Sequence, residues 1–497
     1  MESLVRAEGR GQLRVRGTVS GRPPANTYYA GDNITLCIMN FVDREDELDW
    51  LTDRLESGER QLLVLYGRRR VGKTALVTHA LSTLEQSSLY FLCDERGTAS
   101  NAERFAVACA DALDDVEPAV DGFEDAFRYL ANRVDGPFVV AIDEFSYLVS
   151  ADETVPSVFQ TVFDETLAGT DVSLVLFGSS ISMMEEGTLS YESPLYGRRT
   201  GQWRLEPFGF DAARQFVPGY DTRDQIRTYA VFGGMPAYLE QLDPADSLLA
   251  NVERRVLAKG SFLYEEPEFL LRQELHEPAT YIAILEAVST GATRVTEIAN
   301  EIDRPASSLS RYLQNLSRLA LLEKETPVTD PDGRGVYRIA DDFLRFWFRF
   351  VSPNRAQLER GATDAVLDAV REGFPTHTSW TFETVCRQAV ATAAFPVECS
   401  RIGRWWYGED EVDVVGLNEG TETLLLGECK WTNERVGVGL LQSLEATEPE
   451  IRWRGEDRTL EYALFSKAGF TDDLAALADE RDDLLLYDVD DVAATFE

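Results

Sequence analysis

The chain has 497 residues, a hydrophobic content of 44% and a formal net charge of −38, from 86 acidic and 48 basic residues. A chain of this length is expected to form several domains, and no stretch approaches the roughly 20 consecutive apolar residues that cross a bilayer. This charge excludes a protein that binds nucleic acid unspecifically over its whole surface, because such binding depends on basic side chains that neutralise phosphates.

The basic residues themselves indicate the kind of source organism. Only five of them are lysine, namely Lys73, Lys259, Lys324, Lys430 and Lys467. Acidic surfaces stay hydrated and soluble where salt screens their self-repulsion, so we expect a halophilic, archaeal source. The N-terminal residues lack the apolar core of a signal peptide, and we therefore expect a cytoplasmic protein without a membrane segment.

Residues 1–38 differ in character from the rest of the chain. They carry five arginines and a Gly/Pro/Asn-rich run from Gly21 to Asn26, without an amphipathic period. One interpretation is a basic tail that binds nucleic acid. We favour the other, a disordered or spurious extension that precedes a true first residue at Met39.

Apolar strands alternate with helices between Phe41 and about residue 205. Strands that are apolar along their whole length and alternate with helices indicate a parallel sheet covered on both faces, so this region is predicted to be α/β. The sequence predicts helices over 45–56, from Lys73, and over 105–113 and 123–134, and strands over 62–66, 90–92, 138–142 and 173–177.

A glycine-containing loop joins the first strand to the helix that begins at Lys73. Phosphate binding needs inward-pointing backbone N–H groups, a helix N-terminus, a cation for the β and γ oxygens and a hydroxyl for Mg²⁺. Lys73 supplies the cation and Thr74 the hydroxyl. This P-loop predicts that the protein binds ATP with Mg²⁺ and hydrolyses it. The residues expected to bind the nucleotide here are Gly67, Arg68, Arg69, Arg70, Val71, Gly72, Lys73, Thr74 and Ala75.

The strand over 138–142 is followed by Asp143 and Glu144. An aspartate at this place can orient Mg²⁺ through its water shell, and the next glutamate can polarise the attacking water. A solvated turn is the alternative for two acids after an apolar strand. Because the pair follows a P-loop by about 70 residues, we favour the catalytic interpretation.

Two further positions are weaker candidates for contacts with the nucleotide. Ser179 and Ser180 end the strand over 173–177, where a polar side chain could sense the γ-phosphate. Arg198 or Arg199 could stabilise charge in the transition state. The alternative for these arginines is an ordinary surface position in an arginine-rich protein.

Residues 276–350 have the pattern of a winged helix-turn-helix. Three short helices over 280–288, 295–302 and 306–319 lead to a turn-rich stretch and a strand over 336–339. On the third helix, Arg311, Asn315 and Arg318 could face a DNA major groove. The alternative is a domain that docks protein or links two parts of the chain.

Several of these segments together resemble the archaeal AAA-like ATPases of the STAND type. The resemblance covers about residues 40–490, and it implies a nucleotide-driven switch whose helical lid carries Pro236 near the adenine. It does not imply a substrate. The matching segments are Phe41 to Leu48, the P-loop, Asp143-Glu144-Phe145, Ser193 to Thr200 and Gly234-Met235-Pro236.

Four residues in the C-terminal part resemble the active centre of the PD-(D/E)XK, or restriction-endonuclease-like, superfamily. Asp413 stands at the start of one strand, Glu428 and Lys430 lie on the next, and Glu383 lies on a helix. Phosphodiester hydrolysis needs carboxylates that hold Mg²⁺ and a group that orients and deprotonates water. Asp413 and Glu428 would be the metal ligands. Alternation along the strand puts Lys430 on the face of Glu428, where it could contact the metal-bound water.

The alternative for this constellation is an ordinary hairpin with charged outward positions, or a nuclease-like domain that only binds. We therefore expect an ATP-binding and hydrolysing switch coupled to a DNA-binding, nuclease-like domain. The other reading is a regulatory or signalling ATPase whose later domains bind partners without cleaving nucleic acid. A homo-oligomer is compatible with both. The predicted segments are an N-terminal extension (1–38), the ATPase core (39–205), a helical lid (206–275), the winged helix (276–350), a linker (351–374) and the nuclease-like α/β domain (375–497).

Overall fold

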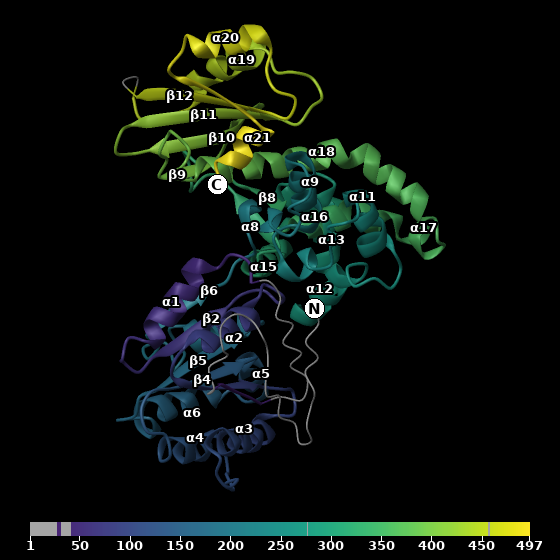
Figure 1. Cartoon of the computed structure of the whole chain (residues 1–497). Coiled ribbons are helices and arrows are strands. Elements are labelled where there is room, and N and C mark those ends of the chain that lie inside the picture. The colour runs from purple at the N-terminus through teal and green to yellow at the C-terminus, as the bar shows by residue number, and fades with distance from the viewer. Residues whose placement is uncertain (1–26, 31–40, 276, 456–457) are drawn as a thin grey trace. The chain divides into compact units, whose positions relative to one another are not determined.

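The computed structural model describes residues 27–30, 41–275, 277–455 and 458–497, which divide into two units (Figure 1). The first unit ends at Glu206 and the second runs from Pro207 to Glu497. Our prediction of a disordered or spurious extension covers residues 1–38. Except for Thr27–Ala30, these residues lie outside the described ones. Within the described ranges, no helix is both long and apolar enough to cross a membrane.

The first unit is built on a sheet in which every neighbouring pair of strands is parallel. The strand order is β1-β3-β4-β5-β2-β6, so the predicted parallel α/β sheet is confirmed. The two edge strands, β1 and β6, had no clear signal in the sequence. The strands are β1 (Thr27–Ala30), β2 (Leu62–Tyr66), β3 (Ser87–Leu92), β4 (Phe138–Asp143), β5 (Val172–Gly178) and β6 (Gly201–Arg204).

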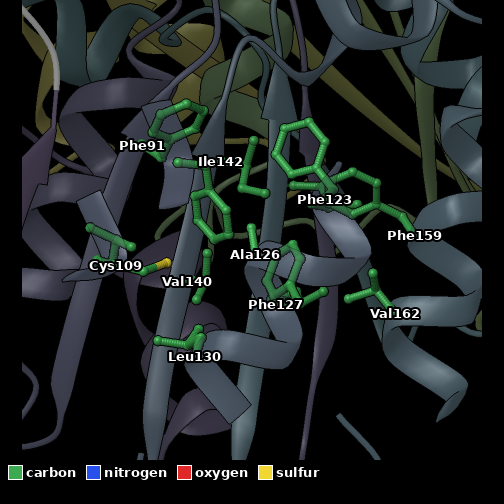
Figure 2. Packing of buried hydrophobic residues seen from close by; sticks show 14 of the residues in the cluster. Phe91, Cys109, Phe123, Ala126, Phe127, Leu130, Val140, Ile142, Phe159 and Val162 are labelled. Atoms are coloured by element: carbon green, nitrogen blue, oxygen red, sulfur yellow. The ribbon is translucent and has the colours of Figure 1, made fainter. Parts of the chain in front are cut away.

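Helices follow the strands of this unit, and several of them bury phenylalanines against one face of the sheet. Figure 2 shows Phe127 and Leu130 of α4 beside Val140 and Ile142 of β4. Burial of such side chains supplies the main stabilisation of the unit. The helices are α1 (Glu45–Leu55), α2 (Lys73–Thr83), α3 (Thr98–Leu113), α4 (Phe123–Ala131), α5 (Phe145–Ala151), α6 (Val155–Thr161), η1 (Val162–Thr166), α7 (Ile181–Met184) and η2 (Glu185–Leu189).

The second unit begins with a helical region, in the segment for which we expected a lid. Gly234 lies here against the backbone of Phe208, whose carbonyl oxygen would be 1.8 Å from a Cβ at position 234. No other residue fits this approach without movement of the backbone. The helices are α8 (Phe210–Arg214), α9 (Thr222–Phe232), α10 (Pro236–Leu239), α11 (Leu248–Asn251), η3 (Val252–Leu257) and α12 (Glu266–Glu274).

Three helices and a two-stranded antiparallel sheet follow, and they confirm the winged helix-turn-helix. Leu309, Leu313 and Leu316 form the buried stripe of the third helix, as its spacing predicts. The elements are α13 (Pro278–Ser289), α14 (Val295–Glu301), α15 (Ala306–Arg318), β7 (Leu322–Glu325) and β8 (Val336–Ile339), and then α16 (Asp342–Phe346), η4 (Trp347–Val351), η5 (Ser352–Asn354) and α17 (Arg355–Glu359).

The last part of the chain forms a five-stranded mixed sheet with the order β13-β12-β11-β10-β9. β9, β10 and β11 are antiparallel, whereas β11, β12 and β13 are parallel. Figure 1 shows α19 and α20 on one face of this sheet and α18 and α21 on the other. The elements are α18 (Thr363–Val390), β9 (Arg401–Tyr407), β10 (Asp410–Asn418), β11 (Thr423–Lys430), α19 (Val438–Thr447), η6 (Glu448–Glu450), β12 (Thr459–Ser466), α20 (Asp472–Asp479), β13 (Leu484–Asp488) and α21 (Val489–Ala494).

The long helix α18 joins the helical region at the start of the second unit to this sheet. It packs on α9 and also on β10 and β11. His377 of α18 bonds the carbonyl oxygen of Ala230 through its Nε2 at 2.8 Å, and the Gln388 side chain accepts a hydrogen bond from the Phe210 amide at 2.9 Å. The segment 351–374, for which we expected a linker, holds η5, α17 and the first turns of α18.

Candidate functional site

The P-loop lies between β2 and α2 in the first unit. Gly67 has a φ of 154°, and the Leu205 carbonyl oxygen would be 2.4 Å from a Cβ there. Gly72 has a φ of 98° at the N-cap of α2. Both positions therefore require glycine for steric reasons, and the loop they shape opens directly into a helix N-terminus.

Lys73 is held inside this loop. Its side chain is buried, and its Nζ donates hydrogen bonds to the carbonyl oxygens of Gly67 and Arg68, each at 2.9 Å. The ammonium group thus stands over the loop whose N–H groups are expected to receive phosphate oxygens. A fixed cation at this position loses little conformational entropy when an anionic ligand binds.

Thr74 and Asp143 meet at the carboxyl end of the sheet. The Thr74 hydroxyl donates a hydrogen bond of 2.7 Å to Asp143 Oδ2, and the Tyr90 hydroxyl donates one of 2.6 Å to the same oxygen. Burial and the neighbouring Glu144 carboxylate raise the pKa of Asp143 to about 6, while the hydrogen bonds from Tyr90 and Thr74 oppose that rise. A hydroxyl beside a carboxylate is a set of hard oxygen donors, which fits Mg²⁺.

Glu144 is the N-cap residue of α5 and has a left-handed backbone, at a φ of 51°. Its carboxylate accepts hydrogen bonds from the Ser179 hydroxyl at 2.8 Å and from the Ser179 amide at 3.2 Å. The two predicted residues therefore lie together at the ends of β4 and β5. In this arrangement Ser179 holds the glutamate, which would otherwise be free to turn toward a water molecule.

Arg199 donates to backbone carbonyl oxygens of η2, Thr188 at 3.3 Å and Leu189 at 3.5 Å, and it lies over the Tyr196 ring. It also lines a shallow depression of about 360 Å³ together with Tyr66, the residue that precedes the P-loop. Arg198 pairs instead with Asp164 at 3.0 Å.

Pro236 is the first residue of α10 and is buried within the second unit. The adenine contact that the family resemblance implies for Pro236 would join it to a loop of the first unit. That contact stays a prediction.

Arg44 supports the P-loop in a way that the sequence motif did not reveal. Its guanidinium donates to the carbonyl oxygens of Val71 at 3.3 Å and Glu206 at 2.7 Å, and it pairs with Glu47 at 2.7 Å. Tyr90 is the second residue of this centre that the sequence did not reveal. A tyrosine inside an apolar strand is expected to be an ordinary core residue. Only the folded structure brings its hydroxyl to Asp143.

The C-terminal constellation is assembled on β10, β11 and α18 of the second unit. Asp413 lies inside β10, where the pairing register with β9 shifts between Val412 and Val415. This is a correction to our expectation of an acid at the start of the strand. The shift marks a β-bulge, a device that re-aims side chains. Asp413 Oδ2 accepts a hydrogen bond of 3.0 Å from the Cys429 amide on β11.

Glu428 and Lys430 lie on one face of β11, in agreement with strand alternation. Lys430 Nζ donates a hydrogen bond of 2.8 Å to Glu428 Oε2. Burial and the Asp413 carboxylate raise the pKa of Glu428 to about 7. Burial alone would lower the pKa of Lys430, but the Glu428 carboxylate outweighs it and the pKa is raised. Lys430 is therefore cationic at neutral pH in this arrangement.

Glu383 reaches the same centre from α18. Burial and the Asp413 carboxylate raise the pKa of Glu383 to about 7, against the lowering effect of Arg404 and Arg387. Arg404 Nε lies 3.6 Å from Glu383 Oε2, and Arg387 donates to the Asp413 carbonyl oxygen at 2.9 Å. All four predicted residues thus belong to one charged cluster.

The donor set of this cluster fits Mg²⁺, which is commonly bound through one or two carboxylates with water in the remaining positions. Asp413 and Glu428 are the two carboxylates that would hold it. Such a site would use two carboxylates and not three, because no group of three or more His, Cys, Asp or Glu side chains in the described ranges is arranged to hold a metal ion.

Not all of the α15 residues that we expected to face DNA have a side chain that is available for DNA contact. Asn315 donates a hydrogen bond of 2.8 Å from its amide to the Tyr281 hydroxyl of α13. It therefore ties the two helices together, whereas Arg311 is exposed and Arg318 is half-buried. Spacing alone could not show that Tyr281 lies opposite Asn315.

Three protein families match successive parts of the chain. Residues 41–242 match an ATPase domain predominantly from Archaea. Residues 282–326 match the IclR helix-turn-helix domain, and residues 347–446 match a family described as "Archaea bacterial proteins of unknown function". The first match includes the P-loop, Asp143 and Glu144, and the third includes Glu383, Asp413, Glu428 and Lys430.

Solved structures resemble the chain more distantly. The Walker-type ATPase paby2304 of Pyrococcus abyssi is 22% identical, with a TM-score of 0.47, over 62% of this chain and 96% of that chain. The STAND protein PH0952 of Pyrococcus horikoshii, which has a tetratricopeptide repeat sensor, is 16% identical, with a TM-score of 0.30, over 70% of this chain and 49% of that one.

Sequence relatives are found in Methanocaldococcus jannaschii. The uncharacterized ATP-binding protein MJ0423 is 38% identical over 55 residues, which are 11% of this chain and 93% of that protein. The uncharacterized protein MJECL04 is 34% identical over 398 residues, which are 79% of this chain and 87% of the relative. The chain therefore belongs to the same protein family as MJECL04, with an ATPase domain of the predominantly archaeal type at residues 41–242.

Proposed function

We propose that the protein is an Mg²⁺-dependent, ATP-hydrolysing switch that controls a nuclease-like C-terminal centre. The observation that carries the ATPase part is the meeting of Thr74 with Asp143 beside a Lys73 fixed over the P-loop. Lys73 would neutralise the β and γ oxygens, and the loop amides would orient the phosphates. Mg²⁺, when bound, would neutralise charge on the transferred phosphoryl group.

Glu144 is the residue that would activate water. Its carboxylate is held by Ser179, so hydrolysis requires Glu144 to leave that hydrogen bond or to polarise water from it. The family resemblance to STAND ATPases supports the role of a switch. The lid that carries Pro236 would then respond to the bound nucleotide.

The ATPase part is tested by ATP turnover and nucleotide binding at molar salt, with and without Mg²⁺. The net charge of −38 motivates the high salt, which we associate with a halophilic source. Lys73→Ala is expected to lose turnover by about 100-fold or more, as when one transition-state donor is removed. Lys259→Ala, at an exposed lysine paired with Glu359, is the matched control and should leave turnover unchanged. Unchanged turnover in Lys73→Ala would refute the proposal.

The nuclease part is supported by Asp413, Glu428, Lys430 and Glu383 in one cluster. The chain's own groups would hold the metal through Asp413 and Glu428, and Lys430 would orient the water that attacks the phosphorus. Lys430 is already protonated beside Glu428, so it cannot act as the general base that accepts a proton from water. Positioning and charge stabilisation are therefore the roles assigned to it.

Incubation with plasmid and linear DNA in Mg²⁺ or Mn²⁺, with and without ATP, tests this part. Wild-type protein and Lys259→Ala should cleave, and Lys430→Ala and Asp413→Asn should not. Retained ATP turnover without cleavage under any of these conditions would favour the alternative, a regulatory or signalling ATPase whose winged helix and C-terminal domain bind partners only.

A further inference from the structure

The wing of the winged helix is attached to the C-terminal sheet within the second unit. The Val328 amide, just after β7, donates a hydrogen bond of 2.9 Å to the carbonyl oxygen of Arg404 on β9. A Cβ at Gly403 would lie 3.1 Å from Val328 Cβ, so the two segments touch. Because β9 is an edge strand of the five-stranded sheet, the wing covers an edge that would otherwise expose unpaired backbone groups.

Arg404 is the centre of a charge network that crosses this contact. Its guanidinium is 5% exposed, and it pairs with Glu325 of the wing at 3.3 Å and with Glu411 at 3.2 Å. Arg338 of β8 pairs with the same Glu325 oxygen at 2.9 Å. Strands β7 and β8 of the winged helix therefore each contribute a charged side chain to the network that reaches the nuclease-like cluster.

The guanidinium is held just short of Glu383. Its Nε is buried, faces Glu383 Oε2 at 3.6 Å, and makes no hydrogen bond within the described part of the chain. That separation is beyond a good N–H···O hydrogen bond, for which about 2.9 Å is usual. A buried donor that stops short of a carboxylate needs an opposing restraint, and the two hydrogen bonds to Glu325 and Glu411 supply it.

We propose that Glu325 of the wing is a positioning residue of the C-terminal centre, because it holds Arg404 away from Glu383 and so keeps that carboxylate available as a further negative group beside the metal that Asp413 and Glu428 would hold. Glu411 pulls on the same guanidinium but is 63% exposed, so solvent screens its pair with Arg404. Glu325 is 18% exposed and is the stronger restraint. The winged helix is thereby a part of the centre, and whatever displaces the wing would alter the centre directly. This inference rests on the proposed function of the centre as a metal site.

Binding of Mn²⁺ to the full chain without nucleotide, measured by calorimetry, tests the proposal. Asp413→Asn defines the background binding. Glu325→Gln is expected to bind Mn²⁺ about tenfold more weakly, the size of coupling found within one charged network. The Glu325→Asp variant should recover most of the affinity. Glu419→Gln, which removes an acid that is 55% exposed and paired with Arg401, controls for the loss of one charge and should change nothing.

A double-mutant cycle separates positioning from a general effect on structure. In an Arg404→Met background, Glu325→Gln should have no further effect on Mn²⁺ affinity, since its influence passes through Arg404. An equal effect in both backgrounds, or affinity within twofold of wild type in Glu325→Gln, would overturn the inference.

A crystal structure of Glu325→Gln gives a second measurement that does not depend on metal. Arg404 Nε is expected to close onto Glu383 at hydrogen-bonding distance, and an unchanged separation would overturn the inference. If wild-type protein shows no binding that depends on Asp413, the proposed metal function fails. Even then, the position of Arg404 in the crystal structure of Glu325→Gln would decide whether Glu325 restrains Arg404.

Discussion

The two candidate centres of the molecule are organised by different physical means. At the P-loop, the key groups are held by neutral donors and acceptors: Lys73 by backbone carbonyls, and Asp143 by the hydroxyls of Thr74 and Tyr90. At the C-terminal cluster, carboxylates crowd together and are balanced by arginines and a lysine. The first centre is prepared by hydrogen bonds, and the second by a balance of charges.

This difference implies different sensitivities. Each hydrogen bond between a neutral and a charged group contributes about 2 kcal/mol, so the loss of one weakens the P-loop centre without collapsing it. A buried charge that loses its partner costs more. The C-terminal cluster should therefore respond strongly to pH and to the removal of any one charge.

The largest expected effect is on ATP turnover in Asp143→Asn. The carboxylate is the charged group of the first centre that would orient Mg²⁺, so we expect turnover to fall by about 100- to 1,000-fold. Thermal stability should fall by only about 1 kcal/mol, because the amide oxygen can still accept from Thr74 and Tyr90, whereas the amide nitrogen cannot accept from the Glu144 amide as Asp143 Oδ1 does. Turnover within tenfold of wild type would remove Asp143 from the mechanism.

Arg404→Met should be the most damaging change to stability. It removes the most deeply buried of the cations beside Glu383 and Glu325, which then keep only Arg387 at 3.9 Å and Arg338 at 2.9 Å, and we expect a loss on the order of 3 kcal/mol in the free energy of unfolding. Denaturation followed by tryptophan fluorescence gives that value. Arg401→Met, at a half-exposed arginine on the same strand, is the control and should cost less than about 1 kcal/mol.

The stability of the metal-free protein should fall as pH rises from about 5 to 8. Glu383 and Glu428 have pKa values of about 7 when folded, above the ordinary value for glutamate, so the folded state binds more protons across this range. We expect a fall on the order of 2 kcal/mol for each of the two carboxyls, a smaller total in Glu428→Gln, and partial recovery with Mg²⁺ at pH 8. Melting curves at several pH values in chelator check this. Constant stability would show that the two carboxyls titrate normally.

Tyr90→Phe is expected to have the smallest effect. It removes one of the two hydroxyls on Asp143 Oδ2 and leaves Thr74 in place. Turnover should fall by about tenfold, the equivalent of one hydrogen bond to a charged group. A loss as large as that in Asp143→Asn would show that the first centre is as fragile as the second.

The sequence predicted the features that depend on neighbouring residues. The P-loop and the Asp143-Glu144 pair are local motifs, and the parallel strands of the first unit are apolar along their whole length. The edge strands β1 and β6 were missed because each has only four residues, too few for a clear apolar pattern.

Contacts across large sequence separations could not be predicted. The Tyr90 hydroxyl meets Asp143 only after β3 and β4 pair, and Glu325 meets Arg404 across 79 positions. The bulge at Asp413 depends on how β9 pairs with β10. In each case the sequence contains the residue but no local pattern that identifies its partner.

The helix α18 limits how the chain can be divided. A fragment that starts at β9 would lack Glu383, and one that starts at α18 would leave His377 and Gln388 without their partners at Ala230 and Phe210. The smallest soluble piece that retains the C-terminal centre should therefore begin near Pro207. Genes that recombine this sheet with another ATPase would have to carry the helices α8 to α12 and the winged helix along with it.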